Sequence, residues 1–269
     1  MWLVAADKRI EYAEEVHDIT RGADEKSLRL LCPTKRIMSR GDTLNLSTLQ
    51  VDIEAAFDGV LSVEVTHWSG AARRKPDFDL YPDGKPDFNS SITDGDKGTT
   101  LSSGSLSATV SSSEHVFRIG FHPSGESKEL TALQDRSVGL AYSPAFINPK
   151  ATEDMTQMKH YVFTQTDLGV GESVHGLGER FGGFNKIGQS VQIWNDDGGT
   201  SSDQAYKNIS FWMSSRGYGV FIDTPDLIDL EIGSERSCRV QTSVEGQRLK
   251  CKLSYNHSLP SLEVPLTRK

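Results

Sequence analysis

The sequence predicts an all-β protein built as one large antiparallel β-sandwich. Apolar residues alternate with polar ones in many short runs, Gly, Pro, Asp and Ser separate the runs, and helical spacing is rare. Alternation with a period of two places successive side chains on opposite faces, so each strand has one face to bury. Two sheets packed face to face bury these faces against each other, which favours a two-layer sandwich.

The predicted strands follow one another along the chain. Their alternating positions, in chain order, are Val51, Ile53 and Ala55; Leu61, Val63 and Val65; Leu106, Ala108 and Val110; Phe117, Ile119 and Phe121; Ile209, Phe211 and Met213; Tyr218, Val220 and Ile222; Ile228, Leu230 and Ile232; Cys238, Val240, Thr242 and Val244. Residues 203–207 are a short helical candidate, and residues 11–16 fit either pattern. Residues 73–100, rich in Asp, Pro, Gly and Lys, are expected to form a surface insertion.

Length and charge exclude several classes of protein. At 269 residues the chain can form a single large sandwich. Its net charge of −8, with Lys and Arg scattered, argues against a nucleic-acid partner. No apolar run approaches the ~20 residues of a membrane-spanning helix, and residues 1–9 turn charged too early for a signal peptide. We therefore expect a cytoplasmic protein with no membrane partner.

No cofactor or metal site is predicted. Cys32, Cys238 and Cys251 are odd in number and far apart, which favours free thiols over a disulfide framework or a CxxC metal site. A dinucleotide site is also excluded, because Phe181 stands where Gly-x-Gly-x-x-Gly needs its third glycine.

Six motifs lie in a fixed order over residues 176–220. They are Gly-Leu-Gly-Glu-Arg-Phe (176–181), Asn-Lys (185–186), Gly-Gln (188–189), Trp-Asn-Asp-Asp-Gly-Gly-Thr (194–200), Ala-Tyr-Lys-Asn (205–208) and Gly-Tyr-Gly-Val (217–220). With these motifs the chain resembles the N-terminal β-sandwich of glycoside hydrolase family 31, in its α-xylosidase branch, over about residues 1–245. The resemblance implies a galactose-mutarotase-like fold and a parent enzyme that hydrolyses an α-linked saccharide with retention. The family's catalytic (β/α)₈ barrel, which holds both catalytic carboxylates, is absent from this sequence.

The end of the chain departs from the family pattern. Residues 250–269 carry four basic residues and one acidic residue, in contrast to the acidic remainder. We expect a sandwich domain at residues 1–245, a divergent and poorly ordered tail at residues 246–269, and a truncated product that is inactive by itself. The missing catalytic barrel would be its natural partner, so a surface near residues 196–208 is expected to be exposed and to cause self-association.

The strongest candidate for saccharide binding is the run Trp194, Asn195, Asp196 and Asp197. Aromatic rings pack on the apolar face of a sugar, planar polar side chains bond its hydroxyls, and the following glycines permit a tight loop. By resemblance, Asp197 reaches the non-reducing sugar; the alternative is an ordinary Asp-Gly turn. A retaining glycosidase needs carboxyl groups ~5–5.5 Å apart on either side of the scissile bond, whereas adjacent carboxylates on one loop diverge. No catalytic residue is therefore predicted.

Two other functions stay open. A free-standing carbohydrate-binding module would use exposed Trp68, Trp194 and Trp212, although Trp68 and Trp212 are expected in the core. An aldose mutarotase would need one of His67, His122 and His175 to face a carboxylate across a concave sheet. Glu179 and Arg180 look catalytic in isolation, but in a glycine-flanked turn such residues more often brace loops.

Overall fold

Antiparallel strands make up most of the computed structural model, which describes residues 2–68, 70, 87–113, 116–144, 158–196 and 204–255. The only helical turn in this described part is the 3₁₀ turn η1 (Arg40–Thr43). The strands are β1 (Arg9–Tyr12), β2 (Asp18–Arg21), β3 (Ser27–Pro33), β4 (Thr48–Phe57), β5 (Val60–Thr66), β6 (Ser90–Gly95), β7 (Gly98–Ser103), β8 (Leu106–Ser111), β9 (Ile119–Pro123), β10 (Thr131–Leu133), β11 (Val138–Pro144), β12 (Met158–Asp167), β13 (Val174–Glu179), β14 (Gln189–Ile193), β15 (Lys207–Ser214), β16 (Tyr218–Ile222), β17 (Ile228–Ile232), β18 (Arg239–Glu245) and β19 (Arg248–Tyr255). The predicted all-β, antiparallel class is confirmed.

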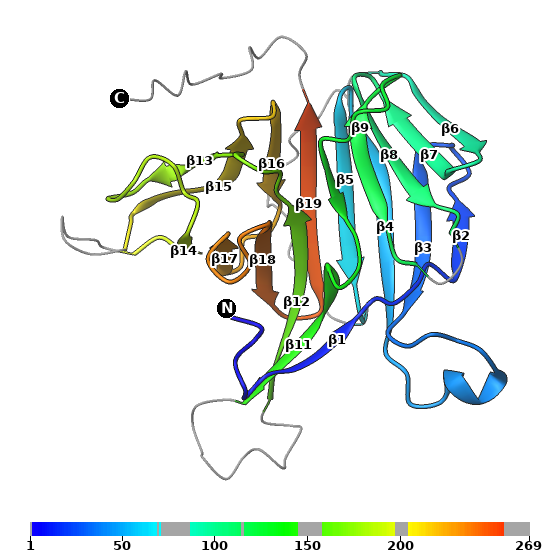
Figure 1. Ribbon diagram of the computed structural model, residues 1–269, viewed down its shortest axis with the longest axis horizontal. Coiled ribbons are helices and arrows are strands. Elements are labelled where there is room, and N and C mark those ends of the chain that lie inside the picture. The colour runs from blue at the N-terminus through cyan, green and yellow to red at the C-terminus, as the bar shows by residue number, and fades with distance from the viewer. Residues whose placement is uncertain are drawn as a thin grey trace.

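The strands form two layers (Figure 1). One layer is an eight-stranded sheet in the order β13-β15-β16-β19-β5-β4-β3-β2. The other consists of a six-stranded sheet, β1-β11-β12-β18-β17-β14, and a five-stranded sheet, β10-β9-β8-β7-β6. Strands β7 and β8 lie over β4 and β5, and β12 and β18 lie over β19. The sandwich therefore has one continuous layer and one layer with a seam between β10 and β12.

The core lies between the layers and follows the predicted alternation. In β4 the side chains of Val51 and Ile53 are fully buried, whereas Asp52 and Glu54 between them are partly exposed. Burying one such aliphatic side chain contributes ~1.5–3 kcal/mol, so the many buried positions of β4, β5, β8 and β9 account for the pairing of the layers.

The prediction for the tail is wrong for residues 248–255. They form β19, which pairs with β16 on one side and with β5 on the other. Leu249, Cys251 and Leu253 point into the core. The basic residues that alternate with them face outward and are paired, since Arg248 lies 3.0 Å and Lys250 3.6 Å from Glu64. The basic residues of this segment therefore lie on the outer face of a strand whose other face is in the core. Residues 256–269 lie outside the described part.

Three other local predictions needed correction. Trp212 is buried as expected, but Trp68 is 60% exposed after the end of β5. In β15 the buried face carries Trp212 and Ser214, while the predicted apolar set, including Ile209 and Met213, faces outward. The helix predicted at residues 203–207 is wrong for residues 204–207, which are not helical, and Lys207 begins β15. Residue 203 lies outside the described part. Of the surface insertion expected at residues 73–100, residues 73–86 lie outside the described part, and residues 90–95 and 98–100 belong to β6 and β7.

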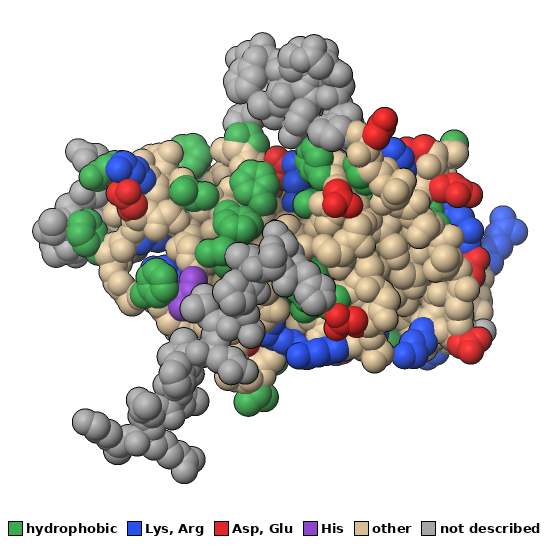
Figure 2. All heavy atoms as spheres, turned by 90° about the horizontal axis from the view of Figure 1, so that it is seen from above, with side chains coloured by type: hydrophobic (Ala, Val, Ile, Leu, Met, Phe, Trp, Pro, Cys, Tyr) green, Lys and Arg blue, Asp and Glu red, His purple; other side chains and the backbone are tan. Residues whose placement is uncertain are grey.

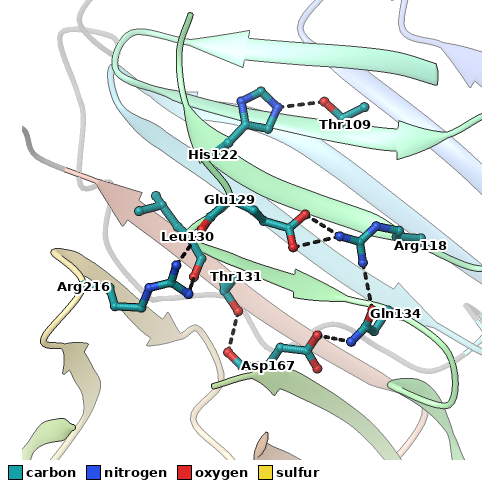
Figure 3. Close-up of polar contacts among 9 residues, drawn as sticks. All are labelled: Thr109, Arg118, His122, Glu129, Leu130, Thr131, Gln134, Asp167 and Arg216. Atoms are coloured by element: carbon teal, nitrogen blue, oxygen red, sulfur yellow. Dashed lines mark hydrogen bonds and ion pairs between the residues drawn. The ribbon is translucent and has the colours of Figure 1, made fainter. Parts of the chain in front are cut away.

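The seam between the two smaller sheets is closed by polar side chains (Figure 3). Arg118 bonds Glu129 through both carboxylate oxygens, at 2.8 and 2.6 Å, and Gln134 at 2.9 Å. Gln134 in turn donates to the carboxylate of Asp167 at the end of β12, and Thr131 donates to the Asp167 carbonyl oxygen at 2.7 Å. Burial raises the pKa of Asp167 to about 6, although the nearby Arg239 opposes this. The network ties β10 to β12 where no strand pairing does.

Candidate saccharide-contact site

The predicted saccharide-binding run begins directly after β14. Trp194, Asn195 and Asp196 are all exposed, with Trp194 at 52%. Asp197 and the Gly-Gly-Thr that follows it lie outside the described residues, as do residues 201–203. The chain is described again from Gln204, whose amide donates to Asp196 at 3.3 Å, and it enters β15 at Lys207.

Asn208 joins the two ends of this loop. Its side-chain nitrogen lies 2.7 Å from the carbonyl oxygen of Trp194 and 2.7 Å from that of Ala205. The side-chain oxygen of Asn195 accepts both from this nitrogen, at 3.1 Å, and from the Asn208 backbone N–H, at 3.0 Å. The backbone N–H of Asp196 also donates to the Ala205 oxygen at 3.0 Å. The loop 196–204 is therefore closed at its base by one asparagine.

Arg180 supports the asparagine from the preceding turn. Its guanidinium donates to the side-chain oxygen of Asn208, and to the carbonyl oxygen of Gln192 at 3.0 Å. The prediction that Arg180 braces loops is confirmed. Glu179 lies at the rim and pairs with Lys207 at 3.2 Å.

Glycines allow the Glu179–Arg180 turn to lie close to β15. Gly176 and Gly178 have φ values of +112° and +84°, and the register shifts between them. A Cβ atom on Gly178 would lie 2.1 Å from the Lys207 carbonyl oxygen, which is closer than any side chain tolerates. The glycines thus bring Arg180 within reach of Asn208.

Two hollows lie on either side of the loop base. The first, of about 260 Å³, is lined by Trp194, Asn195 and Asn208, and also by Thr224 and Asp226 from the connection between β16 and β17. Sequence analysis missed Thr224 and Asp226, because Thr-Pro-Asp reads as an ordinary turn and nothing in the sequence links it to Trp194. The Thr224 hydroxyl donates to the Asp226 carboxylate at 2.9 Å.

The second hollow, of about 430 Å³, lies at the Glu179–Arg180 turn. It is lined by Gly176, Gly178, Glu179, Arg180, Phe181, Gly182, Phe184, Lys186, Gln204, Ala205, Tyr206 and Lys207. Three of its aromatic side chains are largely exposed, with Phe184 at 80%. Trp194 and Asn195 of the predicted saccharide-binding run therefore line the first hollow, whereas the Gly-Glu-Arg-Phe turn lines the second.

The three histidines do not meet the requirement for mutarotation. Within the described residues, His122 bonds the Thr109 hydroxyl at 2.8 Å and the Pro123 oxygen (Figure 3). His67 bonds Gln247, and His175 bonds Ser173 and the Phe184 oxygen. None of these partners is a carboxylate.

The described ranges contain neither a metal-binding cluster nor a membrane-spanning helix. No three His, Cys, Asp or Glu side chains converge there in a way that could hold a metal ion. No helix in these ranges is both long enough and apolar enough to cross a bilayer. The thiols of Cys32 and Cys251 are buried and that of Cys238 is exposed, and none of the three is in a disulfide.

A family model for the glycosyl hydrolase 31 N-terminal galactose mutarotase-like domain matches residues 50–228. The chain belongs to this family. The match spans β4 to the start of β17, and so includes the Glu179–Arg180 turn, Trp194 and Asn208. The resemblance on which the sequence analysis relied is confirmed.

Two curated relatives of this chain are α-xylosidases. The chain is 37% identical over 257 residues to the α-xylosidase of Emericella nidulans, covering 93% of this chain and 32% of that one. It is 34% identical to the α-xylosidase XylQ of Lactiplantibacillus pentosus, and the match covers 94% of this chain and 31% of that one. The fold is similar to that of the cycloalternan-forming enzyme of Listeria monocytogenes, solved with a pentasaccharide substrate, with a TM-score of 0.68 and 13% identity over 93% of this chain and 21% of that one. The chain thus spans about a third of the length of its α-xylosidase relatives.

Proposed function

We propose that this chain is the saccharide-contacting N-terminal portion of an α-xylosidase-like glycoside hydrolase that acts on α-linked sugars. The similarity to two α-xylosidases over nearly the whole chain supports the substrate class. The observation that carries the proposal is the exposed Trp194 loop, which Asn208 closes at its base. In this proposal the fixed positions of Trp194, Asn195 and Asn208 reduce the ordering cost when the sugar arrives.

Each residue at the site has a distinct part in this proposal. The Trp194 ring packs against the C–H face of a sugar, which aromatic rings favour. The Asn195 side-chain oxygen is used within the loop, so its N–H groups donate to sugar hydroxyls. Asp197 accepts a hydroxyl hydrogen bond at the non-reducing end. Arg180 and Asn208 hold the loop and do not touch the sugar.

The chain does not hydrolyse the glycosidic bond by itself in this proposal. A covering catalytic domain, as in the longer relatives, supplies the two carboxyl groups that flank the scissile bond. The sandwich contributes affinity and orientation, which lower the barrier only when the sugar is positioned against those carboxyls.

The test joins the full chain to the remaining two thirds of the Emericella nidulans α-xylosidase, in place of that enzyme's matching third. The chain alone should leave an aryl α-xyloside at background, and the joined protein should hydrolyse it. In the joined protein Asp197→Ala should lower kcat/KM roughly 10- to 100-fold, the effect of one charge-assisted hydrogen bond worth ~1.5–3 kcal/mol.

Two results would contradict the proposal. Turnover by the chain alone that survives purification and disappears in Asp197→Ala would place catalysis in the sandwich. Saturable xylose binding by the chain alone, together with a joined protein that is insensitive to Asp197→Ala, would favour a free-standing carbohydrate-binding module.

A further inference from the structure

Thr109 and His122 form a hydroxyl–imidazole pair on the outer face of the five-stranded sheet. In β8 the side chains of Ala108 and Val110 are buried in the core, so Thr109 between them faces outward. His122 follows the buried Phe121 in β9 and faces the same way. Both side chains are partly exposed, and the Thr109 hydroxyl lies 2.8 Å from His122 Nε2 (Figure 3). A hydroxyl nucleophile and a base are therefore within hydrogen-bond reach of each other and of solvent.

The other ring nitrogen of His122 fixes the direction of this bond. His122 Nδ1 lies 3.2 Å from the Pro123 carbonyl oxygen, which can only accept, so Nδ1 carries the proton. In the neutral ring Nε2 is then an acceptor, and the Thr109 hydroxyl donates to it. Thr100 lies opposite Thr109 in β7, and its hydroxyl donates to the Thr109 oxygen at 2.9 Å, because the Thr109 proton is already used. His122 thus presents a lone pair to the Thr109 proton, as a general base does.

The position of Thr109 inside a sheet limits what this pair can do. Strand β8 lies between β7 and β9, so the backbone N–H groups next to Thr109 are directed at the neighbouring strands and not at the outer face. An oxyanion formed above Thr109 therefore receives no stabilisation from them. Only an ester with a good leaving group can react at a useful rate, and the acyl group is then removed slowly.

We propose that Thr109 is a nucleophile activated by His122, and that it accepts the acyl group of an activated ester. The Thr109 oxygen bonds to the ester carbonyl carbon, and its proton passes to His122 Nε2. The bond from that carbon to the leaving-group oxygen breaks, and the leaving phenol or alcohol takes the electron pair and then the proton from His122. The product is an ester on Thr109. This site is separate from the Trp194 loop, and the inference does not rest on the proposed function.

The experiment treats the full chain with p-nitrophenyl acetate and follows acetylation by mass spectrometry. Trypsin releases residues 98–118 as one peptide, because Lys97 and Arg118 are its flanking cleavage sites. Fragmentation of this peptide should locate the acetyl group on Thr109. Thr100 in the same peptide is the internal reference, because its hydroxyl donates to Thr109 and not to a histidine. We expect Thr109 to be acetylated roughly 100-fold faster than Thr100, the lower end of the general-base effect.

Variants separate activation by His122 from simple exposure of Thr109. His122→Gln can still bond the Thr109 hydroxyl but cannot take its proton, so acetylation of Thr109 should slow roughly 100-fold. Thr109→Ser keeps a nucleophile and should be acetylated at that position, whereas Thr109→Val should not. Thr100→Val is the matched control, because it leaves the nucleophile and base in contact, and it should change the rate less than about fivefold. Amide NMR spectra confirm that each variant is folded.

Three results would overturn the proposal. Acetylation of Thr109 no faster than that of Thr100 would mean that its hydroxyl is not activated. An unchanged rate in His122→Gln would exclude His122 as the base. Acetyl groups on lysine and histidine side chains alone would show that the hydroxyl of Thr109 is only a bonded surface group.

Discussion

The side-chain amide of Asn208 makes four hydrogen bonds at the base of the loop 196–204. Its donors bond oxygens of Trp194, Asn195 and Ala205, and its oxygen accepts from Arg180. Each such bond contributes ~0.5–1.5 kcal/mol, and a buried group left without its partner costs ~1–3 kcal/mol. The side chain of Asn208 therefore reinforces a base that the backbone bond from Asp196 to Ala205 also holds.

Asn208→Ala should release the loop while the sheets stay folded. We expect a loss of ~1–3 kcal/mol in unfolding free energy and faster protease cleavage within residues 196–204. Asn208→Asp is the matched variant, because it keeps the oxygen for Arg180 and removes the donors. Urea unfolding and limited proteolysis measure the two effects. If Asn208→Asp is cleaved as slowly as the parent chain, the donors do not hold the loop.

At the scale of single residues, the sequence predicts which side chains of this loop are exposed, but it does not predict which residues hold them in place. Trp194 and Asn195 stand shortly before Gly198 and Gly199 in a polar run, which predicts a surface loop. Arg180 and Asn208 bond the backbone oxygens of Gln192, Trp194 and Ala205. Every residue has such an oxygen, so the sequence gives no signal for these contacts. Asp226 reaches the same hollow only because β16 and β17 belong to different layers.

Strand β19 shows how an element can be misread from its charges. Lys250 and Lys252 alternate with Cys251 and Leu253, so the segment has the period of a strand, but its basic residues suggested a tail. The acids that pair with them, Glu64 and Asp223, lie in β5 and after β16. The alternation was the reliable signal, and the composition was misleading.

Ending the chain before β19 should prevent folding. A chain of residues 1–245 would leave β5 and β16 each with one neighbour missing in the middle of the eight-stranded sheet, with Val65 and Val220 at the open edges. A chain of residues 1–255 keeps every strand that the structure describes and is the control. We expect well-dispersed amide NMR signals, typical of a folded protein, for the longer chain and poorly dispersed amide signals, typical of an unfolded one, for the shorter chain. A well-dispersed spectrum from residues 1–245 would show that β19 is dispensable.

The seam between β10 and β12 should make stability depend on pH. The pKa of Asp167 is raised to about 6 in the folded chain, above the ~3.9 of an unfolded aspartate. The folded state therefore binds the proton more tightly, and this stabilisation is present below pH ~4 and lost as pH rises through about 6. Because the side chain is 23% exposed and Arg239 lies 3.4 Å away, we expect a loss of only ~1–2 kcal/mol.

Urea unfolding of the parent and of Asp167→Asn, at pH 4.5 and pH 7, measures this loss. The variant cannot titrate at this position, so the difference in unfolding free energy between the two proteins should change by ~1–2 kcal/mol across the interval. An unchanged difference would mean that Asp167 has an ordinary pKa.

Exposed apolar side chains gather at one end of the whole molecule. Figure 2 shows hydrophobic side chains mainly over the half that carries β13 to β16. In this region the exposed large ones are Phe181, Phe184, Trp194, Tyr206, Ile209, Met213 and Phe221. Exposed apolar side chains that gather in one region often mark an interface. Its position agrees with the expectation of a surface for a covering domain near residues 196–208.

The chain alone should self-associate through this end. Contacts between domains of one chain bury ~600–1,500 Å², so an uncovered contact of this size favours association at micromolar concentration. Light scattering should give a mass above that of a monomer, and Ile209→Thr with Phe221→Thr should reduce it. Met38→Thr with Leu44→Thr is the control, because these side chains are exposed at the opposite part of the sheet. A monodisperse monomer at these concentrations would contradict the prediction.

The central place of β19 has a consequence for synthesis in the cell. Strands β2 to β5 end at Thr66, yet their neighbour β19 is complete only at Tyr255, 189 residues later. At ~5–20 residues per second, the ribosome needs roughly 10 to 40 s to cover that interval. During this time the free edge of β5, with its apolar face, has no strand to pair with and can bind other nascent chains. Slow translation between these strands should therefore lower the soluble yield, and a chaperone that shields unpaired edges should restore it.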